Sequence, residues 1–150
     1  KDCSIAKPLS KKAAAIGLDA ESLLIAGFIH LACGDNLKSN AYLKESLRLS
    51  PIDSGYMATQ MYAANLFVLG KNDELKLFIG DKINNKDIWG MILWYYAAFE
   101  LESDNFDKAK LYFEKGKENG ARGQWIISNL RNADAAEDLI KSLEPLGSLD

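Results

Sequence analysis

The chain is poor in the residues that most catalytic and metal sites need. It has one histidine, His30, two cysteines, Cys3 and Cys33, and three prolines in 150 residues. These cysteines and the histidine are too few for a zinc site or a disulfide scaffold. His30 has no partner at metal-ligand spacing and no sequence link to a nucleophile, and the glycines form no phosphate-binding loop. The sequence therefore predicts no enzyme, no cofactor and no metal, and we interpret His30 as a packed core imidazole.

A long hydrophobic run and an excess of basic charge are also missing. The longest apolar run, residues 88–99, is shorter than the ~20 residues that a membrane-spanning helix needs. The net charge of −3 gives the chain no attraction for nucleic acid or anionic lipid. The lysines between residues 108 and 117 are interleaved with acidic residues and indicate a solvated helix face. We expect one ordinary domain that binds neither nucleic acid nor membranes.

The two cysteines leave the redox state and the compartment open. A Cys3–Cys33 bridge would fit a periplasmic protein, whereas both side chains would stay thiols in the cytosol. We expect a cytoplasmic protein, with the periplasm as the alternative if the two cysteines are bridged. The chain begins at Lys1 rather than at methionine. We therefore expect a piece of a longer protein, whose missing part can hold the activity.

Helix-forming segments separated by stop signals make up nearly the whole sequence. Apolar residues recur with a period near 3.6, and alternating strand patterns are absent, so we expect an all-α fold. Asp19, Asp53 and Asp87 are suited to begin helices, and Gly34 and Gly70 to end them. The expected helices cover residues 1–18, with Pro8 in the first turn, and residues 20–33, 37–49, 55–69, 72–83, 88–103, 106–119, 124–131 and 133–143.

These helices recur in pairs. Three pairs begin near Ala20, Tyr56 and Gly90, 36 and 34 residues apart, and two helices per period of about 34 residues are typical of a solenoid. The units carry small residues where their two helices would cross and a bulky apolar residue about a turn later. The small residues are Gly27, Ala63, Ala97, Ser39 and Ala109, and the bulky ones are Leu43, Ile79 and Phe113. Pro51 ends the first unit.

The pattern resembles the tetratricopeptide repeat (TPR) family over nearly the whole chain. Residues 20–51 match closely and residues 90–121 match well, whereas Leu75 replaces the small residue in the second helix of the middle unit. The resemblance implies a single all-α domain, a right-handed α-solenoid of about three helix pairs. Its parts would be the second helix of a preceding unit at 1–18, unit 1 at 20–53, a degenerate unit 2 at 54–86, unit 3 at 87–121 and capping helices at 122–150.

A narrower resemblance concerns the parent protein. Residues 47–53 (LRLSPID), a long apolar helix and residues 69–74 (LGKNDE) look like the C-terminal repeat domains of bacterial winged-helix transcription activators of the ToxR/OmpR type. Similar domains are attached to some class III adenylate cyclases. Neither the DNA-binding nor the cyclase motifs of those families occur in these 150 residues. The resemblance implies a regulatory or assembly domain.

The TPR resemblance also implies where a partner would bind. The first helices of such units line the concave side of the superhelix. The resemblance therefore implies a partner-binding groove on these first helices. Its residues would be Leu24, Phe28, Leu31, Gln60, Ala64, Phe67, Met91, Trp94, Ala98 and Leu101. The alternative interpretation is that these residues are buried against neighbouring helices. The family's carboxylate clamp uses Lys, Asn and Arg at such positions, so we expect an apolar helix or peptide as the guest, with self-association as the rival.

The sequence thus predicts a protein–protein interaction domain, the regulatory or oligomerisation part of a bacterial transcription activator. One alternative is a free-standing chaperone or secretion adaptor that binds an apolar segment of its client. Another is a small-molecule sensor domain in which Trp94 and Tyr95 form the wall of a pocket between helices.

Overall fold

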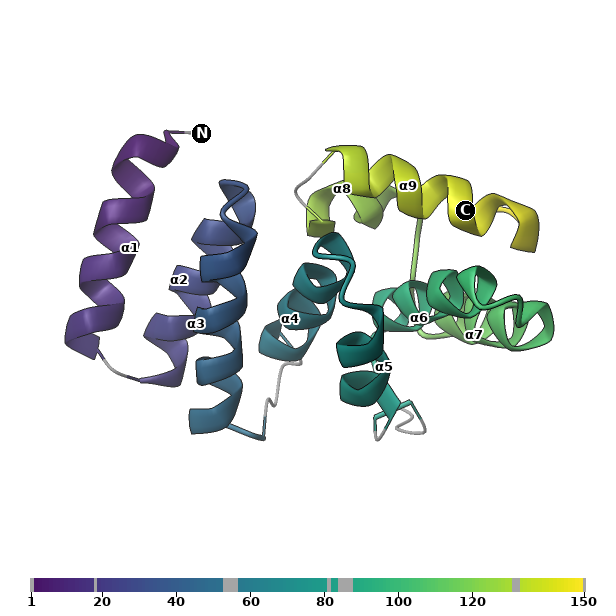
Figure 1. Cartoon of the computed structure of the whole chain (residues 1–150), viewed down its shortest axis with the longest axis horizontal. Helices are drawn as coiled ribbons and strands as arrows, with labels where there is room; N and C mark the ends of the chain where they lie inside the picture. Colours follow the sequence, from purple (N-terminus) through teal and green to yellow (C-terminus); the bar gives the residue numbers. More distant parts are fainter. Residues whose placement is uncertain are drawn as a thin grey trace.

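The computed structural model consists of helices that succeed one another along its long axis from α1 to α7 (Figure 1). It describes residues 2–17, 19–52, 57–80, 82–83, 88–130 and 133–149, and no strand occurs in these ranges. The all-α prediction is therefore confirmed for the described chain. The helices are α1 (Cys3–Gly17), α2 (Ala20–Ala32), α3 (Asn36–Leu49), α4 (Met57–Val68), α5 (Asn72–Gly80), α6 (Gly90–Glu102), α7 (Phe106–Glu118), α8 (Gln124–Leu130) and α9 (Ala133–Leu143), followed by the 3-10 turn η1 (Glu144–Leu146).

Local sequence signals account for several helix ends, and one prediction is wrong. Asp19 caps α2 as expected, because its carboxylate accepts a hydrogen bond from the Ser22 backbone N–H at 2.8 Å. Pro8 was expected in the first turn of the first helix, but α1 already begins at Cys3 and holds Pro8 in its interior. The earlier start is capped by Asp2, whose carboxylate accepts from the Ser4 N–H at 3.1 Å.

Two further helix bounds differ from the prediction by two or three residues. α5 ends at Gly80 rather than at 83, and α6 begins at Gly90 rather than at 88. The Gly90 N–H donates to the carbonyl of Asn119 at 3.1 Å, so the backbone just before α6 is bonded to the end of α7. The predicted starts at Asp53, Tyr56 and Asp87 lie outside the described residues.

The first pair, α2 and α3, crosses where the sequence places small residues. A Cβ added to Gly27 would lie 2.6 Å from Leu43 Cγ, so no larger residue fits there without a shift. The Ser39 hydroxyl donates to the Gly27 carbonyl at 2.9 Å across the same crossing. The predicted close approach at Gly27 is confirmed. Ala63 in α4 and Ala97 in α6 are both fully buried.

The pair α6–α7 has an equally close crossing, but around an aromatic ring. A Cβ on Gly116 of α7 would lie 2.7 Å from Trp94 Nε1 of α6. The same Trp94 nitrogen donates to the Phe113 carbonyl at 3.1 Å, and the two rings stack with centroids 5.4 Å apart. Gly116 thus makes room for the largest fully buried side chain of the molecule's described part.

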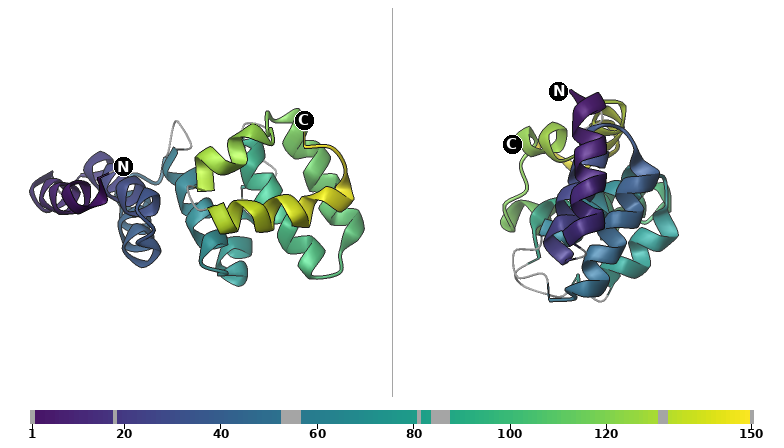
Figure 2. Two further views of the ribbon diagram at one scale, coloured as in Figure 1. Left: turned by 90° about the horizontal axis from the view of Figure 1, so that it is seen from above. Right: turned by 90° about the vertical axis from the view of Figure 1, so that its left-hand side faces the viewer.

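The C-terminal helices fold back over the middle of the chain. α8 contacts α4, and α9 contacts α6, so the two lie across one side of the α4–α7 helices (Figures 1 and 2). Ala136, Leu139 and Leu143 of α9 are buried in the main core. As a result α6 is surrounded by α4, α5, α7 and α9.

The apolar interior is divided unequally. The main core runs from Leu31 and Leu43 through α4–α7 to α9 and η1. A second, small cluster of Ala14, Leu23 and Ala26 joins α1 to α2. A Cys3–Cys33 disulfide, with Cα atoms 5.7 Å apart, ties the first turn of α1 to the residue that follows α2.

Candidate functional site

The ten residues of the expected partner-binding groove do not form one open surface. Five of them are at most 1% exposed and belong to the main core: Leu31, Ala64, Met91, Trp94 and Ala98. The alternative interpretation, burial against neighbouring helices, holds for these five. For Met91, Trp94 and Ala98 the physical reason is the packing around α6, which contacts α4, α5, α7 and α9. Leu31 of α2 and Ala64 of α4 are buried because their helices contact each other and α3. These five side chains cannot contact a partner in this structure.

The other five groove residues are only partly exposed. They are Leu24, Phe28, Gln60, Phe67 and Leu101. Leu24 lines a cavity of about 180 Å³ with the ends of α2 and α3, whereas Phe28 lines another, of about 270 Å³, with Cys3 and Cys33. Phe67 stacks on Tyr95 with ring centroids 5.5 Å apart.

The pocket wall expected from Trp94 and Tyr95 is also part of the core. Both residues are fully buried, and Trp94 is hydrogen-bonded to the backbone of α7. The interpretation of His30 as a core imidazole is confirmed, since His30 is 3% exposed and its Nδ1 lies 3.2 Å from Asp35 Oδ2.

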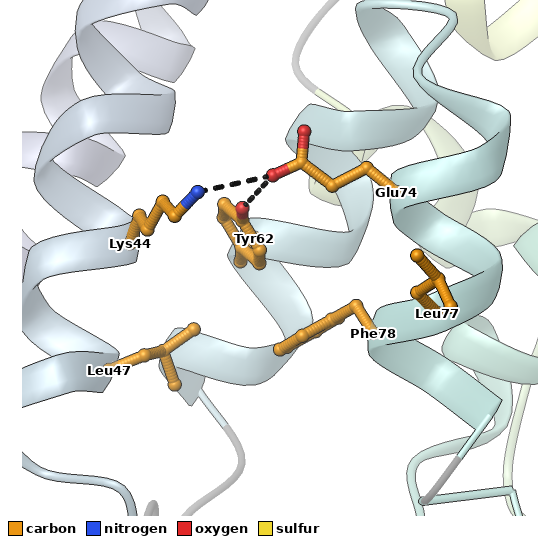
Figure 3. Close-up of a pocket in the computed structure, with 6 residues that line it drawn as sticks. All are labelled: Lys44, Leu47, Tyr62, Glu74, Leu77 and Phe78. Atoms are coloured by element: carbon orange, nitrogen blue, oxygen red, sulfur yellow. Dashed lines mark hydrogen bonds and ion pairs between the residues drawn. The ribbon is translucent and has the colours of Figure 1, made fainter.

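A cleft between α3, α4 and α5 combines accessible apolar side chains with a fixed polar group. It has a volume of about 350 Å³, and we call it the α3–α5 cleft (Figure 3). Its lining residues are Lys44 and Leu47 of α3, Tyr62 of α4, and Glu74, Leu77 and Phe78 of α5.

The polar end of the α3–α5 cleft is organised around Glu74. The Tyr62 hydroxyl donates to Glu74 Oε1 at 2.6 Å, Lys44 Nζ lies 3.6 Å from the same oxygen, and Lys71 Nζ lies 3.0 Å from Oε2. The hydrogen bond from Tyr62, followed by that from Lys71, lowers the pKa of Glu74. Burial, reinforced by Glu74, raises the pKa of Tyr62. At neutral pH the tyrosine is therefore a protonated donor and the glutamate an ionised acceptor.

The apolar end of the cleft is open to solvent. Leu77 is 79% exposed, and Leu47 and Phe78 are partly buried. The Phe78 ring meets the Tyr62 ring edge-on, with centroids 4.8 Å apart, and Lys82 Nζ lies 4.6 Å from the Phe78 centroid. In Figure 3, Leu47 and Phe78 project toward the cleft from its two sides below the Tyr62–Glu74 pair. The arrangement can bury an apolar side chain next to an oriented polar group.

None of the six cleft residues was among the predicted site residues. A signal existed in α5, where Leu75 and Ile79, four residues apart, already supply the face that enters the core. Leu77 and Phe78 are two further apolar residues of α5 that this core-facing side does not need. The TPR resemblance explains the irregularity of this unit as a degenerate repeat rather than as a site.

Comparison with other proteins assigns the chain to no family. No protein-family model matches it, and neither a curated protein nor a solved structure matches it. The class of protein is thus defined by the fold alone, as an all-α chain of packed helix pairs.

The described residues form neither a cluster of metal ligands nor a membrane-spanning helix. No group of three or more His, Cys, Asp and Glu side chains there could hold a metal ion. No helix in those ranges combines the length and the apolar character needed to cross a membrane.

Proposed function

We propose that the chain is a protein-interaction domain and that its α3–α5 cleft receives an apolar side chain of another protein. The observation that carries the proposal is the accessibility of Leu77, Leu47 and Phe78 around one cleft of about 350 Å³. An apolar residue as exposed as Leu77 is unremarkable alone, but apolar residues grouped at a concave site usually mark a binding surface. The polar group at the other end of the cleft would fix the orientation of the guest.

The charge at the rim supports a particular class of guest. Lys44, Lys71 and Lys82 all lie against cleft residues, and Glu74 is the one carboxylate among the described residues that line the cleft. The Lys44 side chain is 70% exposed, so its ammonium group remains accessible beside Glu74. A helix or extended segment with an apolar anchor flanked by Asp or Glu would complement this rim.

As the architecture that presents the cleft, we propose a right-handed solenoid of TPR-like units. Three features support it: the pairs α2–α3, α4–α5 and α6–α7 follow one another, α4 contacts both α2 and α6, and Gly27 makes a close crossing where the family needs a small residue. In this proposal α8 and α9 cover a side of the last two pairs. An experimental structure in which the pairs stack without a right-handed superhelical twist would contradict it.

For the parent protein we propose the regulatory or oligomerisation part of a bacterial transcription activator. The support is the resemblance of residues 47–53 and 69–74 to such domains. The flanking genomic sequence tests it: an N-terminal winged helix in the same reading frame is expected. A complete reading frame of about this length would instead favour the free-standing adaptor.

Selection of a displayed random-peptide library on the protein tests the cleft. We expect enriched peptides to share an apolar residue flanked by Asp or Glu. Their affinity should fall at least about tenfold with Leu77→Asp and with Lys44→Glu, because the first adds charge to the apolar site and the second reverses the rim. Leu111→Asp is the matched control, since Leu111 is 60% exposed on α7 and does not line the cleft.

Two outcomes would overturn the proposal. In the first, enriched peptides bind Leu77→Asp and Leu111→Asp equally well, which places the binding surface elsewhere. In the second, sedimentation shows that the protein dimerises and that Leu77→Asp alone dissociates the dimer. The occupant of the cleft would then be a second copy of this chain rather than another protein.

A further inference from the structure

A second cavity, of about 440 Å³, lies where α1 meets the ends of α2 and α3. We call it the α1–α3 pocket. Its polar lining residues are Ser4, Lys7 and Lys11 of α1, His30 of α2, Asp35 just before α3, and Lys38 of α3. Cys3 lines it too, so the Cys3–Cys33 disulfide anchors the α1 side of the pocket.

Positive charge exceeds negative charge in the α1–α3 pocket. Asp35 is the one carboxylate among its described lining residues, and it is engaged by Lys38 Nζ at 3.1 Å and His30 Nδ1 at 3.2 Å. Partial burial opposes ionisation of Asp35, but the hydrogen bonds from Lys38 and His30 outweigh it and lower the pKa of this carboxyl. Its charge is therefore balanced by Lys38. Lys7 and Lys11 make no ion pair with the described residues, which leaves two ammonium groups uncompensated.

The buried imidazole beside this pocket lacks one hydrogen-bond partner. His30 is 3% exposed, its Nδ1 faces Asp35, and its ring lies 5.3 Å from the Tyr42 ring. Its other nitrogen, Nε2, has no hydrogen-bond partner within the described chain. The ionised Asp35 can only accept, so Nδ1 donates to it and Nε2 of the neutral ring is left as an acceptor. Because buried polar atoms almost always have a partner, a hydroxyl group of a ligand in the pocket would suit this nitrogen.

We propose that the α1–α3 pocket binds the phosphate group of a small molecule, with Lys7 and Lys11 as its charged donors. A phosphate monoester carries close to two negative charges and three acceptor oxygens, which matches the two ammonium groups. A hydroxyl group on the organic part would donate to His30 Nε2, which accepts while Nδ1 donates to Asp35. A carboxylate carries one charge and would leave one lysine uncompensated. The cavity falls within the usual range of small-molecule sites, about 300–1,000 Å³, and so has room for an organic part. The proposal is independent of the protein-binding function of the α3–α5 cleft.

The single histidine makes a direct test possible, because His30 gives the only imidazole signals in a long-range ¹H–¹⁵N NMR spectrum of the protein. Inorganic phosphate and glycerol 3-phosphate are titrated separately at constant pH and ionic strength, with acetate as the comparison anion. Both phosphates should shift the His30 signals along a saturable curve, and acetate should bind at least about tenfold more weakly. Tighter binding of glycerol 3-phosphate than of inorganic phosphate would identify a phosphorylated small molecule as the ligand.

Two variants assign the binding to the two lysines. Lys7→Ala/Lys11→Ala should weaken phosphate binding by about tenfold or more, since two charged hydrogen bonds are lost. Lys12→Ala is the matched control, because Lys12 lies on the same helix, is exposed, and does not line the pocket. All these side chains are on the helix surface or the pocket wall, so circular dichroism should show unchanged folding.

The proposal fails if Lys7→Ala/Lys11→Ala and wild type have the same affinity, or if the shifts are linear and equal for phosphate and acetate. It also fails if a single-stranded oligonucleotide displaces phosphate at lower concentration than glycerol 3-phosphate does, because the site would then belong to a polyanion. Binding that disappears in Lys12→Ala as well would mean general ionic attraction rather than a site.

Discussion

Helix α1, at the N-terminal end, and helix α6, in the main core, are held in place in different ways. In α6, every residue from Gly90 to Ala98 is buried, and four other helices surround it. In α1, the buried residues are Ser10 and Ala14, and a disulfide supplies the link that apolar packing does not. Helices of one chain can thus be held by burial in one part of the molecule, as α6 is, and by a covalent bond in another, as α1 is.

The largest effect should come from emptying the core at α6. Trp94→Ala removes a fully buried ring stacked on Phe113 together with its hydrogen bond, so we expect a loss of about 3–5 kcal/mol in the free energy of unfolding. Urea unfolding measures it. Trp125→Ala, at a site that is 45% exposed, is the control and should cost less than half as much. Equal losses would contradict the assignment of the stabilisation to the buried Trp94 side chain.

Breaking the disulfide should act on the other end of the molecule. Cys3→Ser/Cys33→Ser opens a link across 30 residues of sequence, for which we expect a loss of about 2–4 kcal/mol. Hydrogen exchange locates the effect. Amides of α1 should exchange much faster while those of α6 keep their protection relative to global unfolding. Unchanged protection in α1 would show that the small Ala14–Leu23–Ala26 cluster suffices to hold it.

A substitution at the α2–α3 crossing should have an intermediate effect. Gly27→Val places a branched side chain against Leu43, and we expect about 1–3 kcal/mol of destabilisation. Gly80→Ala is the control, because a Cβ there meets nothing within 4 Å. Thermal melting should show a lowered Tm for the first variant and an unchanged or slightly raised Tm for the second.

The smallest effect concerns the α3–α5 cleft, which lies between α1 and α6 along the chain. Tyr62→Phe removes the hydrogen bond to Glu74 and should cost about 1 kcal/mol at pH 7. Because the pKa of Glu74 is lowered in the folded protein from its ordinary value of 4.5, this contribution is fully present above pH 4.5 and is lost as the pH falls through the lowered pKa.

Urea unfolding at several pH values compares Tyr62→Phe with wild type. The difference in stability should shrink as the pH falls below 4.5. Tyr42→Phe is the control, since the Tyr42 hydroxyl makes no hydrogen bond within the described chain, and it should show no such trend. A difference that stays constant with pH would mean that Tyr62 acts through packing alone.

The sequence was sufficient to predict most elements because their signals are local. Asp19 caps α2 through its own side chain, and the small Gly27 predicts a close crossing wherever its partner helix lies. The start of α6 was misplaced because a contact from the far end of α7, at Asn119, helps define it. Local propensity carries no information about such a contact.

The candidate sites were less predictable for the same reason. α6 is apolar on all sides, so its period does not reveal which side faces a groove and which faces α9. Trp94 therefore fits both the groove and the core interpretation in the sequence, and its packing against Phe113 and Gly116 of α7 decides for the core. The sequence positions of Cys3 and Cys33 likewise do not show whether the two cysteines are bonded. A disulfide depends on how close the folded chain brings their Cα atoms.

The Cys3–Cys33 bridge has a mechanical consequence. Tension applied to the polypeptide ahead of Cys3 passes through the sulfur–sulfur bond directly to Cys33 and onward into α3. The intervening segment, with the rest of α1 and all of α2, is bypassed and bears no load while the bond is intact. Under oxidising conditions a pulled molecule should lengthen only by the residues beyond Cys33, and a reductant should release the hidden segment as a separate step in extension.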